Sequence, residues 1–94
     1  IVSPGKGMSF QKHFYRNEIW FVSKGKCLVN YSESDPDNYN EIILNTESSL
    51  NVPVGAWHQI TNPYDNPCHI IEIQYGEKTT EDDIERLRFY NKND

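Results

Sequence analysis

The sequence predicts an all-β fold, an antiparallel barrel or sandwich, in one domain that spans residues 1–94. Turn signals rich in Gly, Pro and Asn recur at short intervals, and short runs of β-branched and aromatic residues lie between them. Hydrophobic residues make up 36% of the chain and aromatic residues 13%, which is too apolar for a disordered protein. Because a chain of this length hides only about two-thirds of its unfolded surface, we expect a small core and no second domain.

Seven strands are expected between the turn segments "SPGKG", "SKGK", "SDPDN", "PVG" and "NPYDNP". They cover residues 9–15, 18–23, 26–31, 40–44, 49–52, 58–61 and 68–75, and each has an ordinary strand length. The final segment "TTEDDIERLRFYN" predicts a short C-terminal helix instead. Thr79 or Thr80 would cap it, acidic residues fill its first turn, and Arg86 and Arg88 follow near its end.

The charge pattern and the apolar runs exclude several partners. The net charge is −5 and the basic residues are scattered, which argues against a nucleic-acid partner. No apolar run approaches the about 20 residues of a membrane span, and no secretory signal opens the chain, so we expect no membrane partner and a cytoplasmic location. Cys27 and Cys68 are then expected to be free buried thiols. Because the chain begins at Ile1 rather than Met, a missing upstream segment is also expected.

Polar side chains gather in the stretch "FQKHFYRNEIWFVSKGK", residues 10–26. Side chains two apart on a strand share a face, so Gln11, His13 and Tyr15 are expected to project to one side of the first strand. A tight turn after Tyr15 would place Glu18, on the next strand, beside that row. The segment therefore offers an imidazole, a phenol and a carboxylate on one surface.

A second imidazole comes from "PVGAWHQITN", where His58 follows a Pro and Gly turn that opens a new strand. Two imidazoles, one carboxylate and one phenol can meet inside a barrel. Imidazole and carboxylate ligands together suit Zn, Fe, Mn or Ni, and two His with one carboxylate is also the ligand set of non-haem iron sites. By residue chemistry alone, a hydrogen-bonded polar face of a sheet remains the alternative.

Two spaced motifs resemble those of the cupin superfamily. The first cupin motif is matched by Gly7, His13, Glu18 and Gly25, and the end of the second motif by Pro53, Gly55, His58 and Asn62. The stretches "SFQKHFYRNEIW", "NVPVGAWHQITNP" and "IIEIQYGEKTTEDDIERL" are similar to the cupin-type (type II) mannose-6-phosphate isomerase domain, which is often fused behind a mannose-1-phosphate guanylyltransferase. The resemblance runs from about Pro4 to Leu87, and it implies a jelly-roll barrel, or double-stranded β-helix, around one divalent metal ion.

The sequence departs from the family pattern at two positions. Tyr15 stands where the family has the second His of its His-x-His pair, and Ile19 stands where the family has a His after the Glu. A phenol with a pKa near 10 is a poor ligand unless a metal lowers that pKa. The resemblance therefore implies metal binding by His13, Glu18 and His58, with Tyr15 as a weak fourth ligand, an acid or base, or a hydrogen-bonding group.

The resemblance implies an aldose–ketose isomerase that acts on a sugar phosphate. The metal would polarise the substrate while a base such as Glu18 or Glu72 moves a proton, although Glu72 is equally suited to a structural hydrogen bond. A sugar phosphate also needs cationic anchors, for which Arg16 and Arg86 match the resemblance. Gln11 and Gln74 are expected to line the same cavity.

Two other functions remain open. A non-catalytic sugar-binding or structural cupin is favoured by the loss of the second His. An iron-dependent oxygenase or lyase would use His13, Glu18 and His58 as a facial triad. Fold alone does not decide between these functions, because cupins host many chemistries. A homodimer is expected as well, since a small barrel with an open edge gains from pairing that edge.

Overall fold

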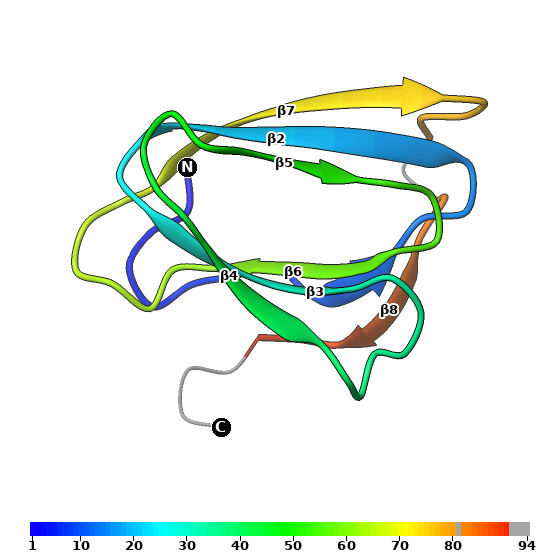
Figure 1. Ribbon diagram of the computed structural model, residues 1–94, viewed down its shortest axis with the longest axis horizontal. Coiled ribbons are helices and arrows are strands. Elements are labelled where there is room, and N and C mark those ends of the chain that lie inside the picture. The colour runs from blue at the N-terminus through cyan, green and yellow to red at the C-terminus, as the bar shows by residue number, and fades with distance from the viewer. Residues whose placement is uncertain (81, 91–94) are drawn as a thin grey trace.

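The chain folds into two antiparallel β-sheets that face each other (Figure 1). The structure is a computed structural model that describes residues 1–80 and 82–90. The strands are β1 (Phe10–Lys12), β2 (Arg16–Lys24), β3 (Cys27–Ser32), β4 (Asn40–Leu44), β5 (Ser49–Val52), β6 (Trp57–Thr61), β7 (His69–Gly76) and β8 (Glu85–Arg88).

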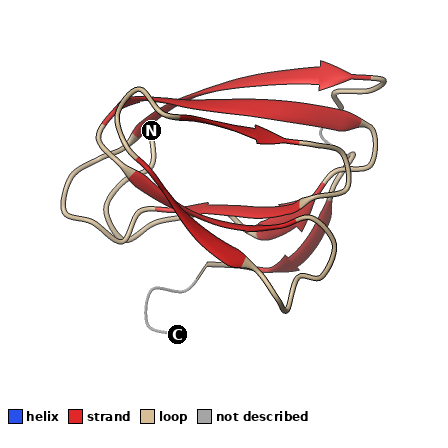
Figure 2. Ribbon diagram, in the orientation of Figure 1, coloured by secondary structure: helices blue, strands red, loops and turns tan. Residues whose placement is uncertain are grey.

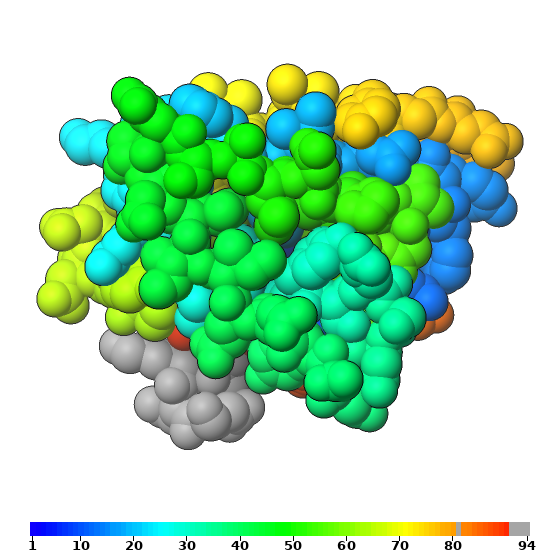
Figure 3. Space-filling model, viewed as in Figure 1, coloured from blue at the N-terminus to red at the C-terminus, as the bar shows by residue number. Residues whose placement is uncertain are grey.

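One sheet has five strands in the order β4-β3-β6-β1-β8, and the other has three in the order β5-β2-β7. The longest ladder joins β2 to β7, from Arg16 opposite Gly76 to Lys24 opposite His69. Figure 3 shows one side of the barrel, which is covered by the segment that runs from β3 through β4 to β5 (teal to green). The predicted all-β jelly-roll fold is confirmed.

The core lies between the two sheets and follows the two-residue period of the strands. On β2, Glu18, Trp20 and Val22 point inward and are buried, whereas Phe21 points outward and is exposed. Buried residues on the other strands, or directly before them, complete the cluster: Cys27, Val29, Leu44, Val52, Ala56, Ile60 and Cys68. Burial of these side chains stabilises the contact between the sheets.

The predicted C-terminal helix is wrong. The described part of "TTEDDIERLRFYN" forms a turn and then strand β8, and no helix occurs in the described residues (Figure 2). Gln11 and Lys12 of β1 pair with Arg86 and Glu85, so the segment completes an edge of the five-stranded sheet. This tertiary pairing outweighs the local helix signals, which are weak for so short a segment. Glu81, which the helix prediction also used, lies outside the described residues.

The expectation of two free thiols is also wrong, because Cys27 and Cys68 form a disulfide. Cys27 opens β3 in one sheet, and Cys68 lies directly before β7 in the other. Their Cα atoms are 6.1 Å apart, within the range of a disulfide. The bond therefore links the two sheets at one end of the barrel.

The outer face of the three-stranded sheet carries exposed apolar side chains. Four of them lie on β2 and β7: Phe21, Ile71, Ile73 and Tyr75. Among the described strands only β2 pairs with β7, so one edge of β7 is open. The homodimer expected from an open edge stays a prediction. No helix within the described residues is long and apolar enough to cross a membrane.

Candidate metal centre

Three elements bring His13, Glu18 and His58 together inside the barrel. His13 follows the end of β1, Glu18 points inward from β2, and His58 lies on β6, where it is opposite Gln11 of β1. The Nε2 atom of His13 is 3.6 Å from Oε2 of Glu18, and Nε2 of His58 is 3.8 Å from Oε1. All three side chains are buried, and one possible ligand atom from each lies within 4.8 Å of the others.

Hydrogen bonds to backbone carbonyls fix the tautomer of both imidazoles. Nδ1 of His13 is 2.5 Å from the Asp83 carbonyl oxygen, and Nδ1 of His58 is 3.0 Å from that of Ala56. A carbonyl oxygen only accepts, so each Nδ1 donates its hydrogen and each Nε2 carries the lone pair of its ring on the side of Glu18. This is how metal-binding histidines are usually oriented.

The Nε2 atom of His58 gives the clearest sign that a cation fits this centre. It is a buried acceptor without a hydrogen-bond partner in the part of the chain that the structure describes, and it lies beside a carboxylate. Burial lowers the pKa of His58 to about 4, against the opposing effects of the Ala56 carbonyl and the Glu18 carboxylate. The imidazole is therefore neutral at pH 7, which is the form that binds metals.

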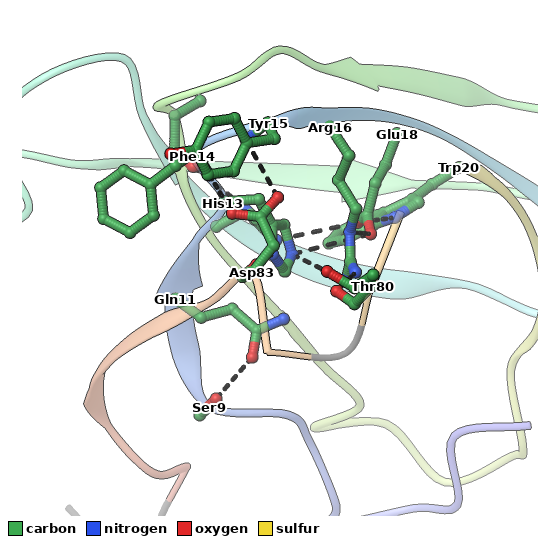
Figure 4. A network of polar contacts seen from close by, with 12 residues as sticks. Ser9, Gln11, His13, Phe14, Tyr15, Arg16, Glu18, Trp20, Thr80 and Asp83 are labelled. Atoms are coloured by element: carbon green, nitrogen blue, oxygen red, sulfur yellow. Dashed lines mark hydrogen bonds and ion pairs between the residues drawn. The ribbon is translucent and has the colours of Figure 1, made fainter. Parts of the chain in front are cut away.

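Both oxygens of Glu18 accept hydrogen bonds from neighbours on the same strand. The indole Nε1 of Trp20 donates to Oε1 at 3.0 Å, and Nε of Arg16 donates to Oε2 at 3.1 Å. Figure 4 shows these side chains directed at one another around His13. Arg16, expected to anchor a substrate, thus lies in contact with two of the three candidate ligands.

Asp83 is the residue that sequence reasoning missed. Its carboxylate accepts hydrogen bonds from the backbone N–H groups of Phe14, at 2.7 Å, and Tyr15, at 3.0 Å, while its carbonyl binds His13. Its only signal in the sequence is its place in the "EDDIERL" ending, where Asp83 falls in the first turn of the expected helix. Asp83 holds the loop that carries His13.

The end of β7 also approaches this loop closely. Gly76 has a φ of 137°, and a Cβ atom at this position would lie only 2.7 Å from the carbonyl oxygen of Tyr15. Only glycine fits this combination of backbone angle and contact. Gly76 and Asp83 therefore hold the loop from two sides.

The structure does not bring Tyr15 to the cluster. Strand β1 ends at Lys12, so the two-residue alternation expected for His13 and Tyr15 stops before it reaches Tyr15. The Tyr15 ring is 44% exposed, and Nζ of Lys78 lies 4.8 Å from its centroid. The predicted roles of Tyr15 as ligand, acid or base therefore lose their geometric basis.

Glu72 and Gln74 lie on the inward side of β7, opposite Trp20 and Glu18 of β2. They are more exposed than their partners because β7 is at the edge of its sheet. Partial burial, followed by the Glu18 carboxylate, raises the pKa of Glu72. Glu72 also lines a cavity of about 420 Å³ together with Lys6. The described lining of this cavity includes neither Gln74 nor the three candidate ligands.

Gln11 of β1 lies between two register partners, His58 on β6 and Arg86 on β8. Gln11 is buried, and its Oε1 accepts a hydrogen bond of 2.6 Å from Ser9, below the cluster in Figure 4. Arg86 is exposed. Within the described residues, neither side chain forms a hydrogen bond or ion pair with His13, Glu18 or His58.

Asn62, the last residue of the second motif, has a structural position. It is fully buried, and its Nδ2 donates to the carbonyls of Val2 and Asn66 at 2.9 and 2.8 Å. Its Oδ1 accepts a hydrogen bond from the N–H group of Tyr64. Asn62 therefore fixes the loop that leads from β6 to the disulfide.

An antiparallel barrel with two imidazoles and a carboxylate directed into its interior is the architecture of a cupin. The family model described as "Mannose-6-phosphate isomerase C-terminal" matches residues 1–89, and the chain belongs to this family. The recognition made from the motifs is thus confirmed.

Curated relatives cover most of the chain. It is 38% identical over 86 residues, or 92% of its length, to the alginate biosynthesis protein AlgA of Pseudomonas putida. It is also 38% identical over 91 residues to a putative mannose-1-phosphate guanylyltransferase of Vibrio cholerae. The matched parts make up only 16% and 18% of these two relatives.

Solved structures support the fold. The capsular polysaccharide assembling protein CapF from Staphylococcus aureus has a TM-score of 0.78 at 22% identity, covering 92% of this chain and 26% of CapF. The sugar 3,4-ketoisomerase QdtA from Thermoanaerobacterium thermosaccharolyticum has a TM-score of 0.74 at 18% identity, covering 93% and 61%. At these identities the two structures show the shared fold.

The mannose-6-phosphate isomerase activity expected from the resemblance is contradicted by the relatives. Their names are mannose-1-phosphate guanylyltransferase and polysaccharide biosynthesis proteins. Membership of the family therefore does not give this chain the isomerase activity in the family's name.

Proposed function

We propose that this chain is a metal-binding cupin domain of a mannose-1-phosphate guanylyltransferase-type protein, and that it binds one divalent metal ion through His13, Glu18 and His58. The observation that carries the metal site is the Nε2 atom of His58, which is buried beside Glu18 and has no hydrogen-bond partner among the described residues. The protein-level part rests on 36–38% identity to guanylyltransferases along nearly the whole chain.

The ligand set narrows the choice of metal. Two neutral imidazoles and one carboxylate suit Zn, Mn, Fe or Ni, and they do not suit Ca or Mg, which prefer oxygen ligands. When bound, such an ion supplies a Lewis acid that can hold hydroxyl or carbonyl oxygens of a sugar phosphate.

The surrounding residues orient the candidate ligands. Trp20 holds one oxygen of Glu18, and the carbonyls of Ala56 and Asp83 direct the two imidazoles. On β7, Glu72 and Gln74 offer polar atoms for sugar hydroxyl groups, because the register places them opposite Trp20 and Glu18. A sugar or sugar phosphate is the ligand class that these groups and the relatives together favour.

Metal content tests the proposal directly. Bound metal is removed from the protein with a chelator, and separate samples are reloaded with Zn, Mn, Fe and Ni and desalted. Inductively coupled plasma mass spectrometry then measures the metal content of each sample. We expect about one ion per chain in the wild type and none in His58→Ala, because the variant lacks one of only three ligands. His69→Ala is the matched control, because His69 is the third histidine of the chain and lies at the start of β7 rather than in the candidate site.

A wild-type protein that retains no metal after every reloading would overturn the metal site. If the metal is retained, calorimetric titration with mannose 1-phosphate, before and after removal of the metal, tests the ligand class. Binding that is equally strong without metal would contradict the proposed role of the ion in holding the sugar phosphate.

A further inference from the structure

Arg16 is the one cationic side chain that contacts the candidate ligands in the described structure. Its side chain is 7% exposed. The guanidinium Nε donates a hydrogen bond of 3.1 Å to Oε2 of Glu18, and Nη2 lies 3.2 Å from Nε2 of His13. Its third nitrogen, Nη1, donates to the Thr80 carbonyl at 3.0 Å. The side chain is thus held at three points, two of them on atoms that would bind a metal.

The chemistry of His13 makes these contacts incompatible with metal binding. Nδ1 of His13 donates to the Asp83 carbonyl, so Nε2 is the only nitrogen with a lone pair, and it has one. Nη2 of Arg16 occupies that lone pair. A metal ion that binds His13 Nε2 must therefore displace Nη2 of Arg16.

The guanidinium of Arg16 compensates the negative charge of the buried Glu18 carboxylate. Glu18 is 2% exposed, and a buried carboxylate is strongly destabilising unless a cation or several donors compensate it. Arginine stays protonated at all ordinary pH values, so Arg16 always supplies that positive charge. A divalent ion supplies the same compensation, and both cations are not needed beside one carboxylate.

We propose that Arg16 is an internal counter-ion that competes with the metal for His13 and Glu18, so that loading the site expels its guanidinium. This inference rests on the metal site proposed above. The competition lowers the affinity for metal and keeps the metal-free barrel folded. Because Nη1 of Arg16 donates to the Thr80 carbonyl, loading also breaks this contact between β2 and Thr80.

Metal affinity in Arg16 variants tests the competition. Dissociation constants for Zn²⁺ are measured by competition with a chromophoric chelator for the wild type, Arg16→Gln and Arg86→Gln. Removing the competitor is expected to tighten Zn²⁺ binding by about tenfold in Arg16→Gln. Arg86→Gln, on exposed β8, is the matched control and is expected to bind as the wild type does.

The possible outcomes separate this inference from the metal site itself. Wild type and Arg16→Gln with equal affinity, or weaker binding by Arg16→Gln, would overturn the competition and leave the metal site standing. Binding by neither protein would overturn both. Zn²⁺ binding by both proteins that is tighter in Arg16→Gln would support the competition.

A second measurement uses the unmodified chain, in case Arg16→Gln fails to fold. The Nε–H groups of the three arginines are followed by nuclear magnetic resonance while Zn²⁺ is added. The Arg16 signal is expected to move to the position of solvent-exposed arginines as the metal binds, with Arg86 and Arg88 unchanged. A bound metal with the Arg16 signal still hydrogen-bonded to Glu18 would refute the displacement.

Discussion

The indole N–H of Trp20 donates a hydrogen bond of 3.0 Å to Oε1 of Glu18, two residues earlier on the same inward face of β2. The Trp20 ring also meets the His58 ring edge-on, with 5.2 Å between the ring centroids. One fully buried side chain therefore orients two of the three candidate ligands. This gives Trp20 a positioning role that its hydrophobic character alone would not suggest.

Replacing Trp20 with Phe keeps an aromatic ring in the core but removes the donor to Glu18. We expect the free energy of unfolding to fall by about 1–3 kcal/mol, because a buried carboxylate oxygen loses its partner. The affinity for Zn²⁺ is expected to weaken by about tenfold, as for other groups that orient metal ligands. Urea denaturation and chelator competition measure the two effects.

Trp57→Phe is the control for this change. Trp57 is also buried and stacks on Phe10 with 6.0 Å between ring centroids. We expect it to lose stability through lost burial but to keep the wild-type affinity for Zn²⁺. Equal Zn²⁺ affinities for Trp20→Phe and Trp57→Phe would show that Trp20 contributes only to packing.

Asp83 offers a second test, because its carboxylate binds two backbone N–H groups of the loop after His13. Asp83→Ala is expected to lower the free energy of unfolding by about 1–3 kcal/mol, the usual range for hydrogen bonds to a charged group. Asp83→Asn is also expected to lose stability, because its amide keeps one acceptor oxygen but sets an NH₂ donor against the second backbone N–H. Urea denaturation of the metal-free proteins measures both.

Asp82→Ala is the neighbouring control for the Asp83 variants. The Asp82 carboxyl is fully exposed, and a hydrogen bond from Thr80 is the main cause that lowers its pKa. We expect no measurable change in the denaturation midpoint for this variant. A loss as large as that of Asp83→Ala would mean that the acidic segment acts through general charge rather than through the two hydrogen bonds.

The strand pattern could be predicted well from the sequence. The expected strands at residues 40–44 and 49–52 match β4 and β5 residue for residue, because both are bounded by clear turn signals. The end of the chain could not be predicted in the same way. The edge of β1 accepts residues 85–88 as a strand, and no local pattern reveals a pairing over more than seventy residues.

The candidate site could be predicted as far as its ligands lie on regular strands. Glu18 and His58 face inward as the alternation requires, and His13 meets them just after β1. The alternation failed for Tyr15, because the strand ends three residues earlier. Asp83 could not be assigned to this loop either, since it is 70 residues from His13 along the chain.

The disulfide between Cys27 and Cys68 leads to a third prediction. It closes a loop of 41 residues and ties β3 to the start of β7. Because a cross-link restricts the unfolded chain, reduction is expected to cost about 2–4 kcal/mol of stability. Thermal unfolding with and without dithiothreitol measures this effect.

The double variant Cys27→Ser/Cys68→Ser controls for other effects of the reductant. Its melting temperature is expected to be low and insensitive to dithiothreitol. Titration of free thiols in the denatured wild-type protein, without reductant, is expected to find none. Two titratable thiols, together with a melting temperature that dithiothreitol does not change, would contradict the disulfide.

The lowered pKa of His58 predicts how stability depends on pH. The pKa is about 4 in the fold, against an ordinary value of 6.5 that the unfolded chain is expected to show. Between these values the unfolded state holds one more proton at this residue than the folded state. Stability rises with pH wherever the unfolded state binds more protons, so the His58 contribution is lost as the pH falls from 6.5 to about 4.

Urea denaturation of chelator-treated protein at several pH values between 4 and 7 tests this expectation. His58→Gln is expected to flatten the decline because it removes the proton uptake of the unfolded state. Glu72, whose pKa is raised in the fold, has the opposite effect, since its folded form takes up a proton first as the pH falls. Glu72→Gln is therefore expected to steepen the decline. Parallel curves for the wild type and His58→Gln would mean that His58 is not held neutral by burial.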